Sequence, residues 1–308
     1  MGAPSAEFEL RGASAPSVEI NRLRRAMSHD PVLEVRTAGL WPASEPRCRA
    51  TAGHRPAILL SATLHTAIHI PFPPRTGYAR PMTQLIFPLA PPTVPIDGET
   101  RAFPVRRIYC VGRNYAAHAR EMGADPAAEP PFFFMKPADA VVLGNRVPYP
   151  PDTDNLHHEV ELVIAIGRGG WDVAYEQALD LVYGYAVGVD LTKRDRQNDA
   201  KAKGQPWERA KSFEASAPIS PIFPAERIGH PKSGAIALAV NGETRQSGDL
   251  ADLILPVPAI IARISEVWTL APGDLIFTGT PEGVSRITRG DHITAQVEGV
   301  ARIDFEMS

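Results

Sequence analysis

The chain has 308 residues, of which 44% are hydrophobic and 22% are charged, a composition typical of a soluble globular protein. Its formal net charge of −3 gives no electrostatic basis for binding nucleic acid, and no apolar run reaches the roughly 18 to 20 residues that a membrane span needs. Two cysteines, Cys48 and Cys110, are too few for a disulfide framework or a thiolate metal site, so we expect a cytoplasmic protein.

Residues 1–81 carry Arg, Ala, Pro and Ser without a steady hydrophobic period and predict no helix or strand. The opening residues lack the basic start and apolar core of a secretory signal, and several early glutamates argue against a transit peptide. We therefore expect 1–81 to be an N-terminal extension that is disordered or not native, with Met82 as the true start. Residues 82–103 are predicted to lead into a catalytic domain over residues 104–308.

From residue 104 onward the hydrophobic pattern becomes regular. A strand over 105–111 is followed through Gly112 by a helix over 113–123, which a glycine ends. Further strands are expected at 132–136, 159–166, 183–189 and 275–278, and helices at 174–182, at 191–204 and from Pro258 onward. The tail predicts a hairpin over 293–307 that turns near Glu298 and Gly299.

Two glutamates interrupt the most hydrophobic of these strands. Because side chains alternate between strand faces, Glu159 and Glu161 share one face with Val163, while Val160 and Leu162 share the other. Both faces are apolar beyond Glu161, which predicts a covered strand with two carboxylates about 7 Å apart. Burying both as anions is costly, so either one is protonated or a metal ion neutralises both. A solvated edge strand would show the same spacing, and the pattern alone does not separate these interpretations.

A third carboxylate ends the next predicted strand, where a sheet presents ligands to a cleft. The apolar run 183–189 leads directly to Asp190. Three carboxylates together suit Mg²⁺ or Mn²⁺, with Ca²⁺ as a further candidate. In the helix that follows, Arg194 and Gln197 would lie on the Asp190 side. The same segment also fits a charged, solvated helix.

His118 and Glu121 are candidates for proton transfer because a spacing of three residues places them on one helix face. A carboxylate on one imidazole nitrogen orients the ring and leaves the other nitrogen free to take a proton from water. Such pairs are also common on helix surfaces. Lys211 is ambiguous in the same way, since it fits a solvated lysine, and Trp207 fits packing better than recognition.

Six motifs taken together resemble the fumarylacetoacetate hydrolase superfamily. They are V-G-R-N-Y-A-A-H at 111–118, F-M-K-P at 134–137, N-L-H-H-E-V-E at 155–161, G-V-D at 188–190, K-S-F at 211–213 and F-T-G-T-P at 277–281. Their order and spacing match over 104–308, and the run 130–142 is most similar to the fumarylpyruvate hydrolases of gentisate breakdown. The resemblance implies an α+β, β-rich fold, a mixed β-roll or sandwich with flanking helices, in a homodimer.

The resemblance also implies roles at the matching positions. Glu159, Glu161 and Asp190 would bind one Mg²⁺ or Mn²⁺. His118 and Glu121 would form a catalytic dyad on a lid segment. Lys211 would stabilise the oxyanion or the enolate, and Arg113 would bind a distal carboxylate. The other implied substrate contacts are Arg194, Gln197, Thr280 and Lys136.

The activity that the resemblance implies is metal-dependent hydrolysis of a 2,4-diketo acid (acylpyruvate), most directly of fumarylpyruvate to fumarate and pyruvate in aromatic catabolism. Water activated by His118 would attack the more distant carbonyl, and the carbon–carbon bond would break to leave a pyruvate enolate at the metal. An oxaloacetate decarboxylase or a dienoic-diacid isomerase would use the same metal and enolate. A catalytically silent metal-binding dimer is the remaining alternative.

Overall fold

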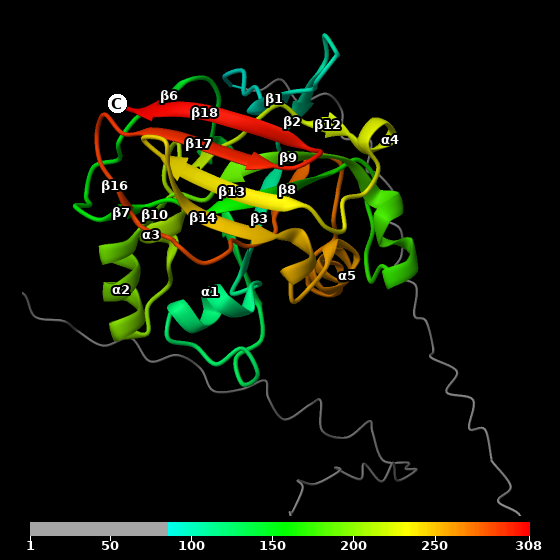
Figure 1. Ribbon diagram of the computed structural model, residues 1–308. Coiled ribbons are helices and arrows are strands. Elements are labelled where there is room, and N and C mark those ends of the chain that lie inside the picture. The colour runs from blue at the N-terminus through cyan, green and yellow to red at the C-terminus, as the bar shows by residue number, and fades with distance from the viewer. Residues whose placement is uncertain (1–85) are drawn as a thin grey trace, which may run out of the picture. The chain divides into compact units, whose positions relative to one another are not determined.

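The computed structural model describes residues 86–308, so the predictions made for residues 1–81 and for Met82 lie outside the described residues. Strands dominate the described part, and its helices are few and short (Figure 1). The fold is therefore α+β and β-rich, as predicted. Within residues 86–308, no helix has the length and hydropathy needed to span a membrane.

Two large sheets lie face to face and form the centre of the fold (Figure 1). The first has six strands, in the order β12 (Phe223–Pro224), β9 (Val182–Val189), β8 (Val160–Ile166), β15 (Asp274–Phe277), β3 (Arg107–Gly112) and β4 (Phe132–Lys136). The second has five strands, in the order β14 (Glu243–Asp249), β13 (Ala235–Val240), β17 (His292–Val297), β18 (Ala301–Met307) and β6 (Arg146–Val147).

Smaller sheets and short helices surround this centre. The small sheets are β1 (Thr93–Pro95) with β2 (Ala102–Pro104), β11 (Ala217–Pro218) with β5 (Val141–Val142), and β10 (Thr192–Lys193), β7 (Leu156–His157) and β16 (Arg286–Ile287). The α-helices are α1 (Ala116–Glu121), α2 (Arg194–Lys203), α3 (Glu208–Lys211), α4 (Ala225–Ile228) and α5 (Val257–Val267). The 3-10 helices are η1 (Ala138–Ala140), η2 (Tyr175–Leu181) and η3 (Leu250–Asp252).

Strand β8 is covered on both faces, as the alternation of its residues predicted. Val160 and Leu162 lie in the larger hydrophobic core, where they meet residues of the five-stranded sheet such as Ile293. Val163 and Ala165 point the other way, into a smaller core on the outer face of the six-stranded sheet. A strand buried on both sides leaves no solvated face for carboxylates, so the edge-strand interpretation is excluded.

The predicted C-terminal hairpin is confirmed, with Ile293 opposite Phe305 and Ala295 opposite Ile303. Three predicted helices differ in detail. The helix predicted over 113–123 spans only α1, because Arg113 has a positive φ of 61° and cannot begin a helix. The segment 174–182 forms the 3-10 helix η2, and the helix predicted from 191 begins later because β10 pairs with β7 first.

Among the strand pairs missing from the prediction are β13–β14 and β1–β2. The hairpin β13–β14 turns at Asn241 and Gly242, which have φ values of 53° and 81°. Asn-Gly is the preferred dipeptide for a tight hairpin turn, so the sequence did contain this signal. All of the pair β1–β2 except Pro104 falls within the predicted lead-in segment 82–103, yet Val94 and Phe103 belong to the smaller core. Tightly packed structure therefore begins before residue 104.

Candidate metal centre and active site

Antiparallel pairing of β8 with β9 brings the three predicted carboxylates together. Glu161 is opposite Gly188, and the Asp190 amide donates to the Glu159 carbonyl at 2.8 Å. All three side chains are buried, and one carboxylate oxygen from each lies within 4.8 Å of the others. Buried carboxylate oxygens at this separation can bind a divalent cation of the Mg²⁺ or Mn²⁺ type.

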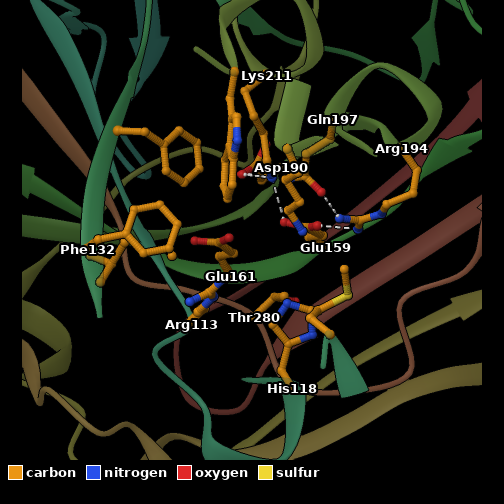
Figure 2. Close-up of a pocket in the computed structure, with 16 residues that line it drawn as sticks. Arg113, His118, Phe132, Glu159, Glu161, Asp190, Arg194, Gln197, Lys211 and Thr280 are labelled. Carbon is orange, nitrogen blue, oxygen red and sulfur yellow. Dashed lines mark hydrogen bonds and ion pairs between the residues drawn. The ribbon is translucent and has the colours of Figure 1, made fainter. Parts of the chain in front are cut away.

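Glu159 and Asp190 are neutralised by basic side chains from the segments that follow β9. The Lys211 ammonium donates to Glu159 Oε2 and to Asp190 Oδ2, each at 2.7 Å (Figure 2). Arg194 donates to Glu159 Oε1 at 2.5 Å. Burial alone would raise the pKa of Glu159, but Lys211 and Arg194 outweigh it and hold that pKa far below its usual range. Glu159 is therefore charged.

Glu161 has a different environment, because it forms no ion pair with any residue between 86 and 308. Its Oε2 accepts a hydrogen bond from the Gly279 amide at 2.6 Å. Burial and the neighbouring Asp190 and Glu159 raise its pKa well above the usual range. A divalent cation would remove this penalty. The donor set and the uncompensated Glu161 therefore fit a metal ion.

A pocket surrounds these carboxylates, and nine of the predicted site residues line it (Figure 2). They are Arg113, His118, Glu159, Glu161, Asp190, Arg194, Gln197, Lys211 and Thr280. Arg194 and Gln197 lie on one face of α2, where Arg194 donates to the Gln197 side-chain oxygen at 2.6 Å. The structure therefore brings together residues that lie far apart in the sequence.

His118 and Glu121 form the predicted pair on α1. His118 Nδ1 lies 3.0 Å from Glu121 Oε2, and Glu121 Oε1 accepts from the Gly283 amide at 3.0 Å. Glu121 does not line the pocket, but it holds the imidazole that does. In Figure 2, His118 approaches the carboxylates from the side opposite Lys211. The pair therefore has the geometry of an oriented general base.

Lys136, predicted as a substrate contact, is not among the residues that line the pocket. Its side chain is fully buried, and its ammonium lies 2.8 Å from Asp190 Oδ1 and donates to the carbonyl of Lys211. Lys136 is thus a partner of a carboxylate in the triad. Arg113 does line the pocket, where it forms an ion pair with Glu129 and lies over the Phe132 ring at 5.5 Å.

Lys201 and several aromatic residues complete the pocket and were missing from the prediction. Lys201 follows Gln197 by four residues on α2, so helical spacing would have identified it. Its ammonium lies 5.2 Å from the centre of the Trp207 ring, which in turn packs edge-on against Phe132. Trp207, predicted to serve packing, therefore packs and also forms part of the pocket wall. Burial, with Arg194 and then Arg113, lowers the pKa of Lys201.

Comparison with known families identifies one match that spans most of the described chain. The family model for the C-terminal region of fumarylacetoacetate (FAA) hydrolase matches residues 107–307. It covers all of the residues that line the pocket.

Individual relatives have two different activities. Over 203 residues the chain is 43% identical to the mitochondrial oxaloacetate tautomerase FAHD1 of Homo sapiens, covering 66% of this chain and 91% of that protein. Over 182 residues it is 48% identical to a fumarylpyruvate hydrolase from a Ralstonia species, covering 59% and 94%. The crystal structure of fumarylpyruvate hydrolase from Pseudomonas aeruginosa in complex with Mn²⁺ and pyruvate matches with a TM-score of 0.71 and 50% identity, over 73% of this chain and 98% of that one.

Proposed function

This chain belongs to the fumarylacetoacetate hydrolase family, and from that premise we propose that it is a metal-dependent hydrolase of 2,4-diketo acids. Its proposed substrate is fumarylpyruvate, which it would convert with water to fumarate and pyruvate. The observation that carries the proposal is the His118–Glu121 pair, which places an oriented imidazole in the same pocket as three carboxylates able to bind a metal. Hydrolysis needs both a base for water and a site that stabilises negative charge on oxygen.

Similarity to fumarylpyruvate hydrolases supports this choice of substrate. The relatives from Ralstonia and Pseudomonas aeruginosa are 48% and 50% identical to this chain, and the second was solved with Mn²⁺ and pyruvate. Pyruvate is a product of the proposed reaction. We further propose residues 104–308 as the catalytic domain, with β1 and β2 packed against it, and the homodimer stays a prediction.

The first step of the proposed reaction is activation of water by the dyad. Glu121 holds His118 Nδ1, so Nε2 is the nitrogen that accepts the proton from water. The oxygen of that water then bonds to the carbonyl carbon farther from the carboxylate of the pyruvyl end. His118 and the carboxylates contribute different chemistry, since one moves a proton and the others hold charge.

The second step is cleavage of the carbon–carbon bond between that carbonyl and the methylene group. The electron pair passes to the pyruvyl fragment, and the proton that His118 took from water is transferred to the methylene carbon to complete pyruvate. Lys211 lies in the pocket wall, where its ammonium already donates to Glu159, Asp190 and Thr192, so it would stabilise the oxygen that becomes negative through its positive charge. A divalent cation bound by Glu159, Glu161 and Asp190 would supply Lewis-acid stabilisation of the same charge.

The far end of the substrate carries a second carboxylate, and the pocket offers two cations for it. Arg113 and Lys201 both line the pocket, and neither forms an ion pair with the carboxylate triad. The aromatic residues Phe132, Phe134 and Trp207 form the adjoining wall. An unsaturated chain that ends in a carboxylate matches this combination of aromatic surface and positive charge.

Oxaloacetate tautomerase is the second candidate, favoured by the 43% identity to the human enzyme of that name. Oxaloacetate is also a keto diacid, but a shorter chain separates its two carboxylates. Its tautomerisation moves a proton and breaks no carbon–carbon bond. The two candidates therefore differ in the products that they release.

A parallel assay tests the proposal. Purified protein with Mn²⁺ is offered fumarylpyruvate, simpler acylpyruvates and oxaloacetate, while diketo-acid absorbance, pyruvate release and the keto–enol ratio of oxaloacetate are followed. We expect fumarylpyruvate to lose its absorbance with stoichiometric release of pyruvate. Conversion of oxaloacetate between its tautomers, with fumarylpyruvate left intact, would contradict the proposal and favour the second candidate.

A further inference from the structure

A buried glutamine from the second sheet connects the backbone of the metal-binding segment to Thr280 in the pocket wall. Gln246 lies on β14, and its side-chain amide reaches across to residues of the first sheet and of the loop after β15. The Gln246 side-chain oxygen accepts from the Val160 amide at 3.1 Å, and its nitrogen donates to Thr280 Oγ1 and to the Pro281 carbonyl, each at 2.8 Å. Val160 is the residue between Glu159 and Glu161.

Two of these partners determine which way the Gln246 amide faces. A backbone N–H can only donate, so the atom that faces Val160 must be the amide oxygen. The carbonyl of Pro281 can only accept, so the atom that faces it must be the amide nitrogen. His158 agrees with this orientation, since its Nδ1 lies 2.8 Å from the same oxygen and must carry the hydrogen of that bond.

The orientation of Gln246 in turn determines the role of the Thr280 hydroxyl. One amide hydrogen goes to Pro281 and the other goes to Thr280 Oγ1, which is therefore the acceptor of that bond. Thr280 donates no hydrogen bond to any residue between 86 and 308, and its side chain lines the pocket (Figure 2). Its own hydrogen is therefore available to a bound molecule.

We propose that Gln246 is a positioning residue that makes Thr280 an obligatory hydrogen-bond donor to an acceptor oxygen of the substrate. The inference rests on the proposed function, in which that oxygen belongs to the keto or carboxylate group of a 2-keto acid. Because Gln246 also holds the backbone between Glu159 and Glu161, one amide sets the donor at Thr280 and the spacing between that donor and the triad.

Gln246→Glu is the discriminating variant because it preserves the shape of the side chain and replaces the amide donor with an acceptor oxygen. The carboxylate oxygen near Val160 would still accept, whereas the atom near Thr280 would become an acceptor. Thr280 would then turn its hydrogen away from the pocket. Gln296→Glu, on the exposed side of β17, is the matched control for the added charge.

The experiment measures the binding of oxalate to the Mn²⁺-loaded protein by calorimetry, since oxalate offers only acceptor oxygens and is not turned over. We expect Thr280→Val and Gln246→Glu each to weaken oxalate binding by about tenfold, and the double variant to be no weaker than either single one. Mn²⁺ affinity without oxalate should match that of the wild type in the two single variants and in the double variant. In Gln296→Glu, the affinities for Mn²⁺ and for oxalate should both match those of the wild type.

Three results would overturn the positioning role. The first is wild-type oxalate affinity in Gln246→Glu. The second is a loss of oxalate affinity from Gln246→Glu that persists in the Thr280→Val background, which would indicate a simple charge effect. The third is weaker Mn²⁺ binding without oxalate, which would indicate a merely structural role. If Gln246→Glu does not fold, Gln246→Met replaces it in the same cycle, and the criterion is then only whether its loss of oxalate affinity disappears in the Thr280→Val background, because methionine no longer holds the Val160 amide. Failure of the wild type to cleave fumarylpyruvate would contradict the proposed function alone, because oxalate binding requires no turnover.

Discussion

The strands that carry the carboxylates and the helix that carries the imidazole contribute to the same pocket, but they are held in place differently. Glu161 and its neighbours belong to β8 and β9, two paired strands buried on both faces. Basic side chains already neutralise Glu159 and Asp190 there. The strand pairing and the buried ion pairs thus hold the three carboxylates that would bind the metal ion.

Helix α1, by contrast, has only six residues, too few to be stable without contacts to the rest of the protein. Asn114 lies just before the helix, and its side chain donates to the carbonyls of Thr278 and Leu255. Near its end, Glu121 accepts from Gly283. A few hydrogen bonds therefore position the half of the site that moves a proton. The comparison predicts that changes in α1 alter turnover, whereas changes in the triad alter metal binding and stability.

Replacing the imidazole is the largest predicted effect. His118→Ala should reduce turnover of the diketo acid by roughly 10²-fold or more, because water loses its base, while Mn²⁺ affinity stays at the wild-type value. Steady-state kinetics and calorimetry on the same preparation check both parts. Weaker Mn²⁺ binding in this variant would show that the two halves are not separable.

A matched pair of glutamine substitutions distinguishes Glu159, which directly precedes β8, from Glu161 within it. Both Glu159→Gln and Glu161→Gln should weaken Mn²⁺ binding, by at least about tenfold. Without metal they should differ, because Glu159 is paired with Arg194 and Lys211 whereas the charge of Glu161 is uncompensated.

Stability measurements on the metal-free variants test that difference. We expect Glu159→Gln to lower the free energy of unfolding by about 3 kcal/mol, since it leaves buried cations without their partner, and Glu161→Gln to leave it unchanged or raise it. Denaturant unfolding in the presence of a chelator provides the comparison. Equal losses in both variants would refute the assignment of Glu161 as the uncompensated carboxylate.

A smaller effect is expected at the far end of the pocket. Lys201→Met should raise KM for fumarylpyruvate by about tenfold through loss of one charge-assisted hydrogen bond. It should change the binding of oxalate little, because oxalate has no distant carboxylate. Arg113→Met is the companion variant. If KM for fumarylpyruvate is unchanged in one of the two variants, the cation removed in that variant does not contact the second carboxylate.

The pH dependence of KM adds a second test at Lys201. Burial, Arg194 and Arg113 lower the pKa of this amine, so it loses its charge at a lower pH than an ordinary lysine does. KM for fumarylpyruvate should therefore rise as the pH increases through that lowered pKa. Lys201→Arg should abolish this rise, because arginine keeps its charge throughout the accessible range. The same rise in the arginine variant would assign it to another group.

The smallest effect concerns mobility without ligand. Amide hydrogens of 113–123 should exchange faster than those of β8, because the short helix depends on few contacts and the strand is buried on both faces. Hydrogen exchange followed by mass spectrometry measures both segments in one experiment. Exchange in α1 as slow as in β8 would argue against a lid.

Local patterns in the sequence were sufficient for much of this structure. The alternation along β8 predicted a strand covered on both faces, and Asp190 could be placed beside it because it ends the next apolar run. The spacing of His118 and Glu121 predicted their contact. Each of these inferences uses residues that are close in the chain or periodic within one element.

Contacts between distant segments were beyond such reasoning. Lys136 looked like a substrate contact, and only the folded chain shows its ammonium against Asp190. Gln246 could not be recognised at all, since its partners Val160 and Thr280 lie far from it in sequence. Its strand β14 was itself missed, although the Asn-Gly turn before it was a usable signal.

The central claim is that this pocket cleaves a 2,4-diketo acid with water activated at His118. Its most direct test is product analysis of fumarylpyruvate turnover in isotopically labelled water, with wild-type protein and His118→Ala side by side in the presence of Mn²⁺. The account predicts fumarate and pyruvate in equal amounts, with label in the new carboxylate of fumarate, and a large loss of both products in the variant. Absence of fumarate from the wild-type reaction, or its undiminished formation by His118→Ala, would contradict the account.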